Sequence, residues 1–157
     1  MRHHAFIPII VLLVSACGSS TASSDGALVI TGTAFSTTLH QNENNTLNLE
    51  LTNGTSRAFQ FESNICPGTL QVYNSQQQLV HDARYFPFLC SAFSAIRTLA
   101  PGETFRWQEG LPAMFVATSG GALTVPPPGT YQVVAGAWYW SSHGKVESTP
   151  VTITIVP

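Results

Sequence analysis

The chain has 157 residues, enough for one domain. Only 9% of its residues are charged, where about a quarter is usual, and 44% are hydrophobic. Six basic and eight acidic residues give a net charge of −2, which provides no basic face for nucleic acid. The hydrophobic content excludes a wholly disordered chain. We therefore expect one exported, β-rich domain without a nucleic-acid partner.

Residues 1–16 have the pattern of a bacterial export signal. A basic start precedes an apolar run over residues 5–14, which is too short to span a bilayer as a helix of about 20 residues. The following Val14-Ser15-Ala16-Cys17 resembles the lipobox of bacterial lipoprotein signal peptides. The resemblance implies cleavage before Cys17 and lipidation of its thiol. The alternative is an ordinary secretory signal that happens to end in a cysteine.

Residues 17–26 would then comprise the lipidated cysteine and a flexible tether of small polar residues. Such a tether reaches at most about 30 Å, so the domain of residues 27–157 would stay close to its membrane. Gly18 stands after the cysteine where an Asp would favour inner-membrane retention. We therefore expect a lipid-anchored protein of the cell envelope, in the outer membrane if the host is Gram-negative.

The other two cysteines, Cys66 and Cys90, remain as a pair once Cys17 carries lipid. Disulfides persist in the compartments that exported proteins reach, and a Cys66–Cys90 bridge would close a loop of about 25 residues. Two separate free thiols are the alternative. A zinc site is disfavoured because neither cysteine belongs to a CxxC pair or has a matched pair of histidines.

Several short strands separated by turn residues follow the tether. Residues 27–40 are rich in β-branched side chains, and residues 46–52 alternate so that Leu47, Leu49 and Leu51 share one face. Asn53-Gly54 indicates a hairpin with a returning strand over residues 57–62. Further strands are expected at residues 69–74, 79–81, 96–99, 103–107, 114–117, 131–140 and 151–156. The pattern predicts an all-β, antiparallel, immunoglobulin-like sandwich of seven to eight strands.

Four pieces in order carry a family resemblance: Leu49–Thr55, Phe59–Ser63, Leu99–Thr104 and Val125–Tyr131. Together they resemble the BsuPI-type intracellular proteinase inhibitor domain, an immunoglobulin-like β-sandwich. The resemblance covers roughly residues 45 to 137 and implies a sandwich that acts on a protein partner, with a protease as the sharpest case. The Pro128-Gly129-Thr130-Tyr131 corner also resembles the tyrosine corner of such sandwiches, where the hydroxyl caps backbone groups.

The sequence offers no constellation that predicts catalysis. No Gly-x-Ser-x-Gly elbow or phosphate-binding loop is present, and His40, His81 and His143 are widely spaced. His81 and Asp82 would point to opposite faces of a strand, so we interpret them as an exposed strand end and not as ligands of one metal ion. We expect neither enzymatic activity, nor a cofactor, nor a metal; an enzyme or a metal carrier is the weakest of the alternatives.

Two groups of side chains are candidates for binding a partner. Arg84, Tyr85 and Phe86 begin an irregular apolar loop that the disulfide would hold rigid, and Arg84 or Tyr85 could enter a protease specificity pocket. The alternative is a hydrophobic flap that seals the sandwich. Trp138 and Trp140 share a strand face and could stack on a carbohydrate, or be buried. We expect a monomeric, protein-binding lipoprotein, with a carbohydrate-binding or structural envelope module as the alternative.

Overall fold

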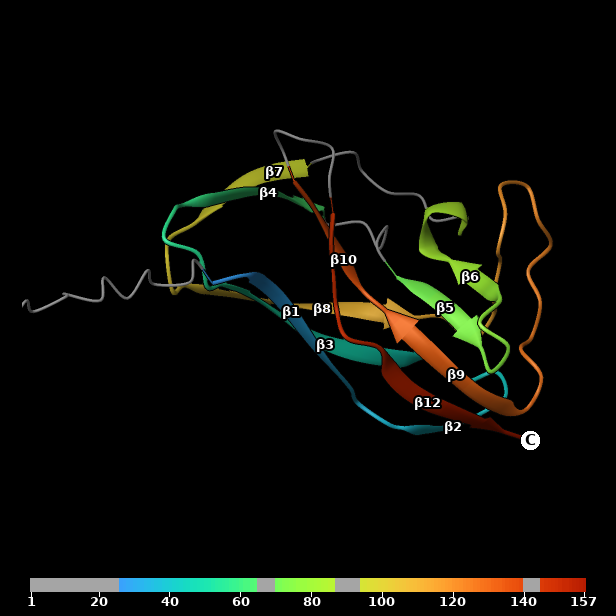
Figure 1. Ribbon diagram of the computed structural model, residues 1–157. Coiled ribbons are helices and arrows are strands. Elements are labelled where there is room, and N and C mark those ends of the chain that lie inside the picture. The colour runs from blue at the N-terminus through green and yellow to red at the C-terminus, as the bar shows by residue number, and fades with distance from the viewer. Residues whose placement is uncertain (1–25, 65–69, 87–93, 140–144) are drawn as a thin grey trace, which may run out of the picture.

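The computed structural model describes residues 26–64, 70–86, 94–139 and 145–157. These residues form an all-β structure of twelve strands and one short 3-10 helix, η1 (Ala83–Tyr85) (Figure 1). No described helix is long and apolar enough to cross a membrane. The all-β prediction is confirmed, whereas the expected number of seven to eight strands is too low. The predicted strand at 131–140 breaks at Ala135, and the stretch at 27–40 divides at a bend.

The strands form three sheets. The first is antiparallel, with β3 (Asn45–Asn53) between β1 (Leu28–Ala34) and β8 (Thr104–Leu111). The second has the order β2 (Thr38–His40), β12 (Val151–Val156), β9 (Gly129–Val134), β5 (Gln71–Asn74) and β6 (Leu79–Asp82). The third has the order β11 (Lys145–Glu147), β10 (Gly136–Tyr139), β4 (Phe59–Asn64) and β7 (Ser94–Leu99). Among the described strands, β2 and β12 pair in parallel, so the expectation of purely antiparallel sheets is wrong at that pair.

The second and third sheets continue into one another. Strand β9 leads into β10 across Ala135, and β11 leads into β12 across Ser148 and two further residues. At this break the Ser148 amide donates to the Ala135 carbonyl (2.8 Å), and the Ala135 amide donates to Ser148 Oγ (3.0 Å). The serine side chain thus satisfies a backbone donor that the interrupted ladder would leave unpaired. The break turns the strands without leaving that buried polar group unsatisfied.

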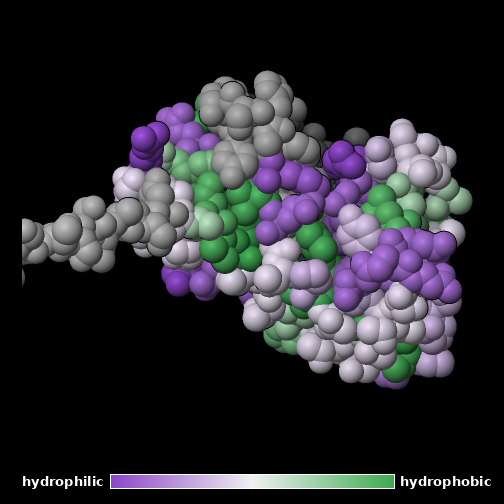
Figure 2. All heavy atoms as spheres, viewed as in Figure 1, coloured by the Kyte–Doolittle hydropathy of each residue, from purple (hydrophilic) through white to green (hydrophobic). Residues whose placement is uncertain are grey.

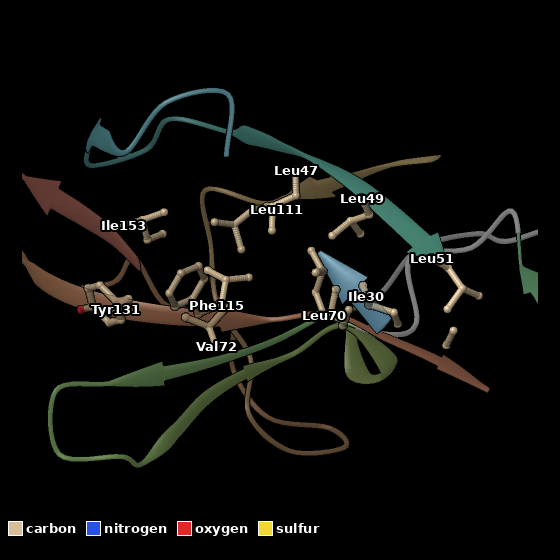
Figure 3. Packing of buried hydrophobic residues seen from close by; sticks show 14 of the residues in the cluster. Ile30, Leu47, Leu49, Leu51, Leu70, Val72, Leu111, Phe115, Tyr131 and Ile153 are labelled. Atoms are coloured by element: carbon tan, nitrogen blue, oxygen red, sulfur yellow. The ribbon is translucent and has the colours of Figure 1, made fainter. Parts of the chain in front are cut away.

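The core cluster draws buried side chains from all three sheets, and Figure 3 shows the part that lies between the first and the second. Leu47, Leu49 and Leu51 of β3 are fully buried, which confirms the predicted alternation. They face a layer built from Val72, Tyr131 and Ile153 on three different strands. Burial of each large aliphatic side chain stabilises the fold by about 1.5–3 kcal/mol before the entropy cost is counted.

The hairpin predicted at Asn53-Gly54 is wrong. Strand β3 pairs with β1 and β8, and the chain after Gly54 crosses to β4 in another sheet. The buried Asn53 amide directs this crossing: Nδ2 donates to the carbonyls of Arg57 (2.8 Å) and Leu99 (2.9 Å), and Oδ1 accepts from Thr55. Gly54 is needed for close approach, because a Cβ there would lie 2.7 Å from the Ala27 carbonyl oxygen.

The molecule is elongated in Figure 1, with the start of β1 at one end and β6, η1 and the C-terminus toward the other. Figure 2 shows the molecule from the same side as Figure 1. The surface seen there is largely hydrophilic, with hydrophobic residues gathered between β1 and the strands β4 and β10. The 3-10 turn that carries Arg84 and Tyr85 is therefore separated along the molecule from the end where the tether would attach.

Candidate functional site

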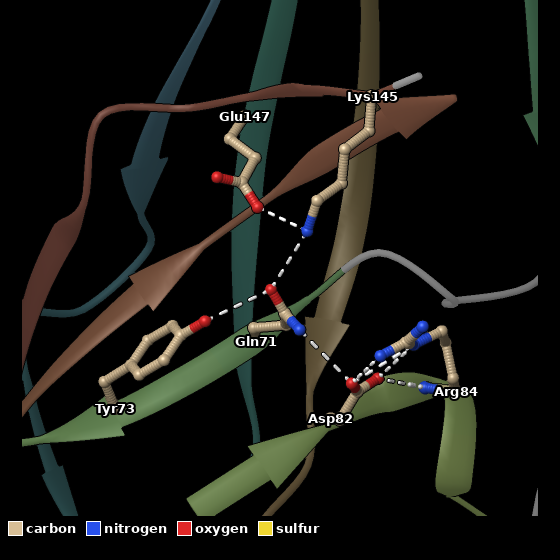
Figure 4. A network of polar contacts seen from close by, with 6 residues as sticks. All are labelled: Gln71, Tyr73, Asp82, Arg84, Lys145 and Glu147. Carbon is tan, nitrogen blue, oxygen red and sulfur yellow. Dashed lines mark hydrogen bonds and ion pairs between the residues drawn. The ribbon is translucent and has the colours of Figure 1, made fainter. Parts of the chain in front are cut away.

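A buried carboxylate organises the turn at the end of β6. Asp82 is 1% exposed and precedes η1, where its Oδ1 accepts from the backbone amide of Arg84 (3.1 Å). The same carboxylate accepts from Arg84 Nε (2.9 Å to Oδ1) and pairs with the Arg84 guanidinium through a terminal nitrogen. Gln71 Nε2 on the neighbouring strand β5 donates to Oδ2 (3.2 Å). Both the backbone and the side chain of Arg84 are thereby fixed (Figure 4).

The polar network extends from this turn to β11. Gln71 Oε1 accepts from Lys145 Nζ (3.4 Å) and from the Tyr73 hydroxyl (3.3 Å), and Lys145 forms an ion pair with Glu147 (Figure 4). Lys145 is also the strand partner of Trp138 in the β10–β11 ladder. Gln71 therefore connects the strand that leads into the Arg84 turn with the hairpin that contains Trp138. This connection could not be predicted, because it joins three parts of the chain, at residues 71–73, 82–84 and 145–147, through ordinary polar side chains.

The charge states of Asp82 and Arg84 follow from their burial and their mutual hydrogen bonds. Desolvation of Asp82 raises its pKa, but hydrogen bonds from Arg84 and Gln71 outweigh that effect and hold the pKa below its ordinary value. The Asp82 hydrogen bonds raise the pKa of Arg84. Both groups are therefore charged at neutral pH, and the charge of Arg84 is largely balanced by a carboxylate that water does not reach.

The surface of the site is formed by Arg84 and Tyr85. The Arg84 side chain remains 46% exposed, and its guanidinium carbon lies 5.5 Å from the centre of the Tyr85 ring. Tyr85 is 38% exposed, which places it among the exposed large hydrophobic residues. Phe86 is half-buried, and its ring contacts His81. An aromatic ring and a guanidinium held in fixed positions are side chains that protein interfaces favour.

His81 and Asp82 are not the exposed strand end that we expected, since both are buried. The backbone amide of Val116 donates to His81 Nδ1 (3.2 Å), and burial lowers the pKa of His81 to about 4 despite the opposing attraction of Asp82. Phe115 and Val116, an apolar pair in a long loop, cover His81 and Asp82. The sequence shows that this pair is apolar but does not show where the loop packs. Among the described residues, no three His, Cys, Asp or Glu side chains are grouped to hold a metal ion.

The predicted tyrosine corner is present. The hydroxyl of the buried Tyr131 donates to the Pro127 carbonyl (2.6 Å), and its ring meets Phe115 edge-on. Burial raises the pKa of Tyr131, so the hydroxyl keeps its proton as donor. Beside it lies a surface cavity of about 310 Å³ lined by Val80, Phe115 and residues from the segments 74–76 and 124–131, none of them charged.

The other predicted site residues lie elsewhere or beyond the description. Cys17, Cys66, Cys90 and Trp140 fall outside the described residues, so the lipidation site and the disulfide remain predictions. Trp138 lies on β10, where its backbone pairs with Glu62 and Lys145. The structure thus connects the Arg84 turn, through Gln71 and Lys145, with the strand pair that contains Trp138, although the two candidates were predicted separately.

No family model and no curated protein matches the chain. Among solved structures it is similar to a β-glucosidase from Erythrobacter marinus at 18% identity and a TM-score of 0.44, covering 83% of this chain but 15% of the glucosidase. It is also similar to the structural-genomics target SoR45, at 10% identity, a TM-score of 0.45, and coverage of 83% and 88%. The C-terminal domain of wzt gives 7% identity, a TM-score of 0.47, and coverage of 82% and 71%.

These likenesses, with TM-scores below 0.5, carry no argument about the activity of this chain, which spans a small part of the glucosidase. The fold and the site define an all-β protein with a preorganised Arg–Tyr turn at one end.

Proposed function

We propose that this chain is a lipid-anchored protein of the bacterial envelope whose immunoglobulin-like, BsuPI-type sandwich binds another protein through Arg84, Tyr85 and Phe86. The observation that carries the proposal is the clamp by Asp82, which fixes the turn of Arg84 and leaves Tyr85 exposed. A turn already held in its bound shape loses less conformational entropy when a partner binds. Protease inhibition is the sharpest form of this function.

The placement of the turn supports the same proposal. The described chain begins near Gly54, at the end of the molecule away from η1 (Figure 1). A lipid on Cys17 would therefore hold the domain by one end and leave the Arg84–Tyr85 surface toward the other. The sandwich assignment is supported by the core between facing sheets and by the Tyr131 corner.

The test of binding uses the full chain, oxidised and purified in detergent, against trypsin-like, chymotrypsin-like and subtilisin-like proteases. We expect a stoichiometric loss of protease activity that persists on long incubation. Tyr85→Ala should weaken inhibition by roughly tenfold or more, as for a residue at the centre of an interface. Phe35→Ala is the matched control, because Phe35 is an even more exposed aromatic (84%) on a different strand end.

If the proteases keep full activity in the presence of excess chain, the chain is not a protease inhibitor. Affinity capture from envelope extracts, with the Tyr85→Ala and Phe35→Ala variants side by side, would then separate a remaining protein partner from a glycan ligand. A partner that is lost with both variants or with neither would overturn the assignment of this surface.

The envelope assignment has its own test. Mass spectrometry of the mature protein should find Cys17 as the first residue with attached acyl chains, and Cys17→Ser should release the protein from the membrane fraction. An intact, unmodified Cys17 in wild-type protein would contradict the anchor. Peptide mapping without reduction should recover Cys66 and Cys90 in one linked pair, and free alkylated thiols at both would contradict the disulfide.

A further inference from the structure

The long segment 112–128 is held against the edge of β6 by both backbone groups of Val116. Strand β6 is the last strand of its sheet among the described residues, and an uncovered last strand presents unpaired backbone groups. The Val116 carbonyl accepts from the Asp82 amide (2.8 Å), and the Val116 amide donates to His81 Nδ1 (3.2 Å). In a regular strand pair the Val116 amide would donate to a backbone carbonyl of β6. Here it donates to the side-chain nitrogen Nδ1 of His81 instead.

The hydrogen bond from Val116 determines the tautomer of His81. Because Nδ1 accepts, the proton of the neutral ring is on Nε2, which is buried and has no hydrogen-bond partner among the described residues. The ring lies between aromatic side chains, 5.3 Å from the centre of Phe115 and 5.9 Å from that of Phe86. The described residues around the ring suit a neutral imidazole and place no acceptor for a second proton.

Phe115 links the contact to the rest of the segment. Its backbone pairs with Thr124 in both directions (2.8 and 2.9 Å), and its ring packs against Tyr131. Phe115 and Thr124 also line the cavity beside Tyr131. Release of Val116 from β6 would therefore loosen one wall of that cavity as well as the cover of the β6 edge.

We propose that His81 is a proton-operated latch, whose neutral ring holds segment 112–128 over the edge of β6 and whose imidazolium releases it. A proton on Nδ1 removes the only lone pair that the Val116 amide can use, so two donors then face each other. The charge would also be fully buried away from water, which opposes the closed state. The inference is independent of the proposed partner.

In the described part of the chain, few charged groups lie on the elements around this ring. Residues 113–117 contain no titratable side chain, and β5 contributes Tyr73 alone. On its own strand, Asp82 attracts the imidazolium, but its carboxylate is already engaged by Arg84 and Gln71. The remaining titratable groups on the elements around the ring are Arg84 and Tyr85 of η1 and Tyr131 of β9.

The size of the effect follows from linkage. Burial lowers the pKa of His81 from 6.5 to about 4 in the closed state, and release would restore the ordinary value. Protonation therefore favours opening as pH falls below 6.5, with an opening constant that increases about 20-fold between pH 7 and pH 5 and roughly 300-fold by complete protonation.

The test is amide hydrogen exchange of the full chain in detergent at pH 7 and pH 5, corrected for the intrinsic exchange rate. We expect the opening constants of the Val116 and Asp82 amides to increase about 20-fold, while the core amide of Leu49 remains much better protected. His81→Gln should abolish the increase, because its amide oxygen can accept from Val116 and does not titrate. His40→Gln is the matched control at an exposed histidine.

Three results would overturn the latch: no increase in the wild type, the same increase in His81→Gln, or exchange of Val116 only at the rate of Leu49. If His81→Gln does not fold, an NMR titration of the wild-type imidazole decides the matter. A pKa of His81 at or above 6.5 would overturn the proposal, since protonation would then not favour opening.

Discussion

The inward face of strand β3 and the end of β6 are both fully buried, but the side chains that they bury differ in chemistry. The inward side chains of β3 are Leu47, Leu49 and Leu51, while β6 ends in His81 and Asp82. Leucines need only a partner face that excludes water, whereas a buried imidazole and carboxylate need particular donors at particular positions. Burial of apolar side chains therefore stabilises the packing of the sheets, whereas specific polar contacts determine where the connecting loops lie.

The largest effect is expected from Leu49→Ala in the hydrocarbon region. Removal of a fully buried leucine leaves a cavity between the sheets and should lower the free energy of unfolding by about 3 kcal/mol. Urea denaturation of the full chain would measure this change in the free energy of unfolding. Leu123→Ala, at a leucine that is 36% exposed, should cost less than about 0.5 kcal/mol. Equal losses for the two would show that β3 does not form the core.

The comparison explains what could be predicted from the sequence. The alternation of Leu47, Leu49 and Leu51 is a local pattern, and it gave the correct buried face. Tyr131 was also predictable, because a Pro-Gly-Thr-Tyr corner brings the hydroxyl to a carbonyl four residues earlier. The leucines can pack against any apolar side chains, and the hydrogen-bond partner of Tyr131 is close to it in sequence.

The polar junctions could not be predicted for the opposite reason. Asn53-Gly54 has the local pattern of a hairpin, but Asn53 bonds Leu99, 46 residues away, and Gly54 makes room for the Ala27 carbonyl. Asp82 before Ala83-Arg84 does have the spacing of a capped turn, a signal that could have been used. Its contact through Gln71 to Lys145 depends on the register of β5, which no short pattern specifies.

A smaller but more specific loss is expected from Asp82→Asn. The amide keeps the shape of the carboxylate but loses its charge, so the charge-assisted bonds to Arg84 weaken and the free energy of unfolding at pH 7 should fall by about 2 kcal/mol. Stability and tryptic cleavage after Arg84 would be measured together, because the turn should also open.

The pH dependence of the same variant separates charge from shape. The pKa of Asp82 is lowered in the folded state, so its contribution is complete above the ordinary value of 3.8 and is lost as pH falls below it. Wild type should therefore keep its advantage over Asp82→Asn from neutral pH down to about pH 4 and lose it in stronger acid. A constant difference at all pH values would mean that the carboxylate acts by shape alone.

Tyr131→Phe tests a polar contact inside the hydrocarbon layer and should have a smaller effect. It removes one hydrogen bond to the Pro127 carbonyl and keeps the ring packing on Phe115, which corresponds to about 1 kcal/mol. The melting temperature should fall by roughly 3 °C. Tyr73→Phe is the matched control, since its hydroxyl makes a longer bond to Gln71 at the surface. A larger shift for Tyr73→Phe would invert the order that burial predicts.

The smallest effect is expected on the outer face of β3 and β8, where Arg106 Nε donates to Glu50 Oε1 at 2.7 Å. The geometry resembles that of Arg84 and Asp82, but the side chains are 70% and 46% exposed. Because water and salt screen such a pair, Arg106→Ala should change the free energy of unfolding by less than about 0.5 kcal/mol at physiological ionic strength. Denaturation at low and high salt measures both the size and the screening. A loss as large as that of Asp82→Asn would show that distance, and not burial, decides what an ion pair contributes in this fold.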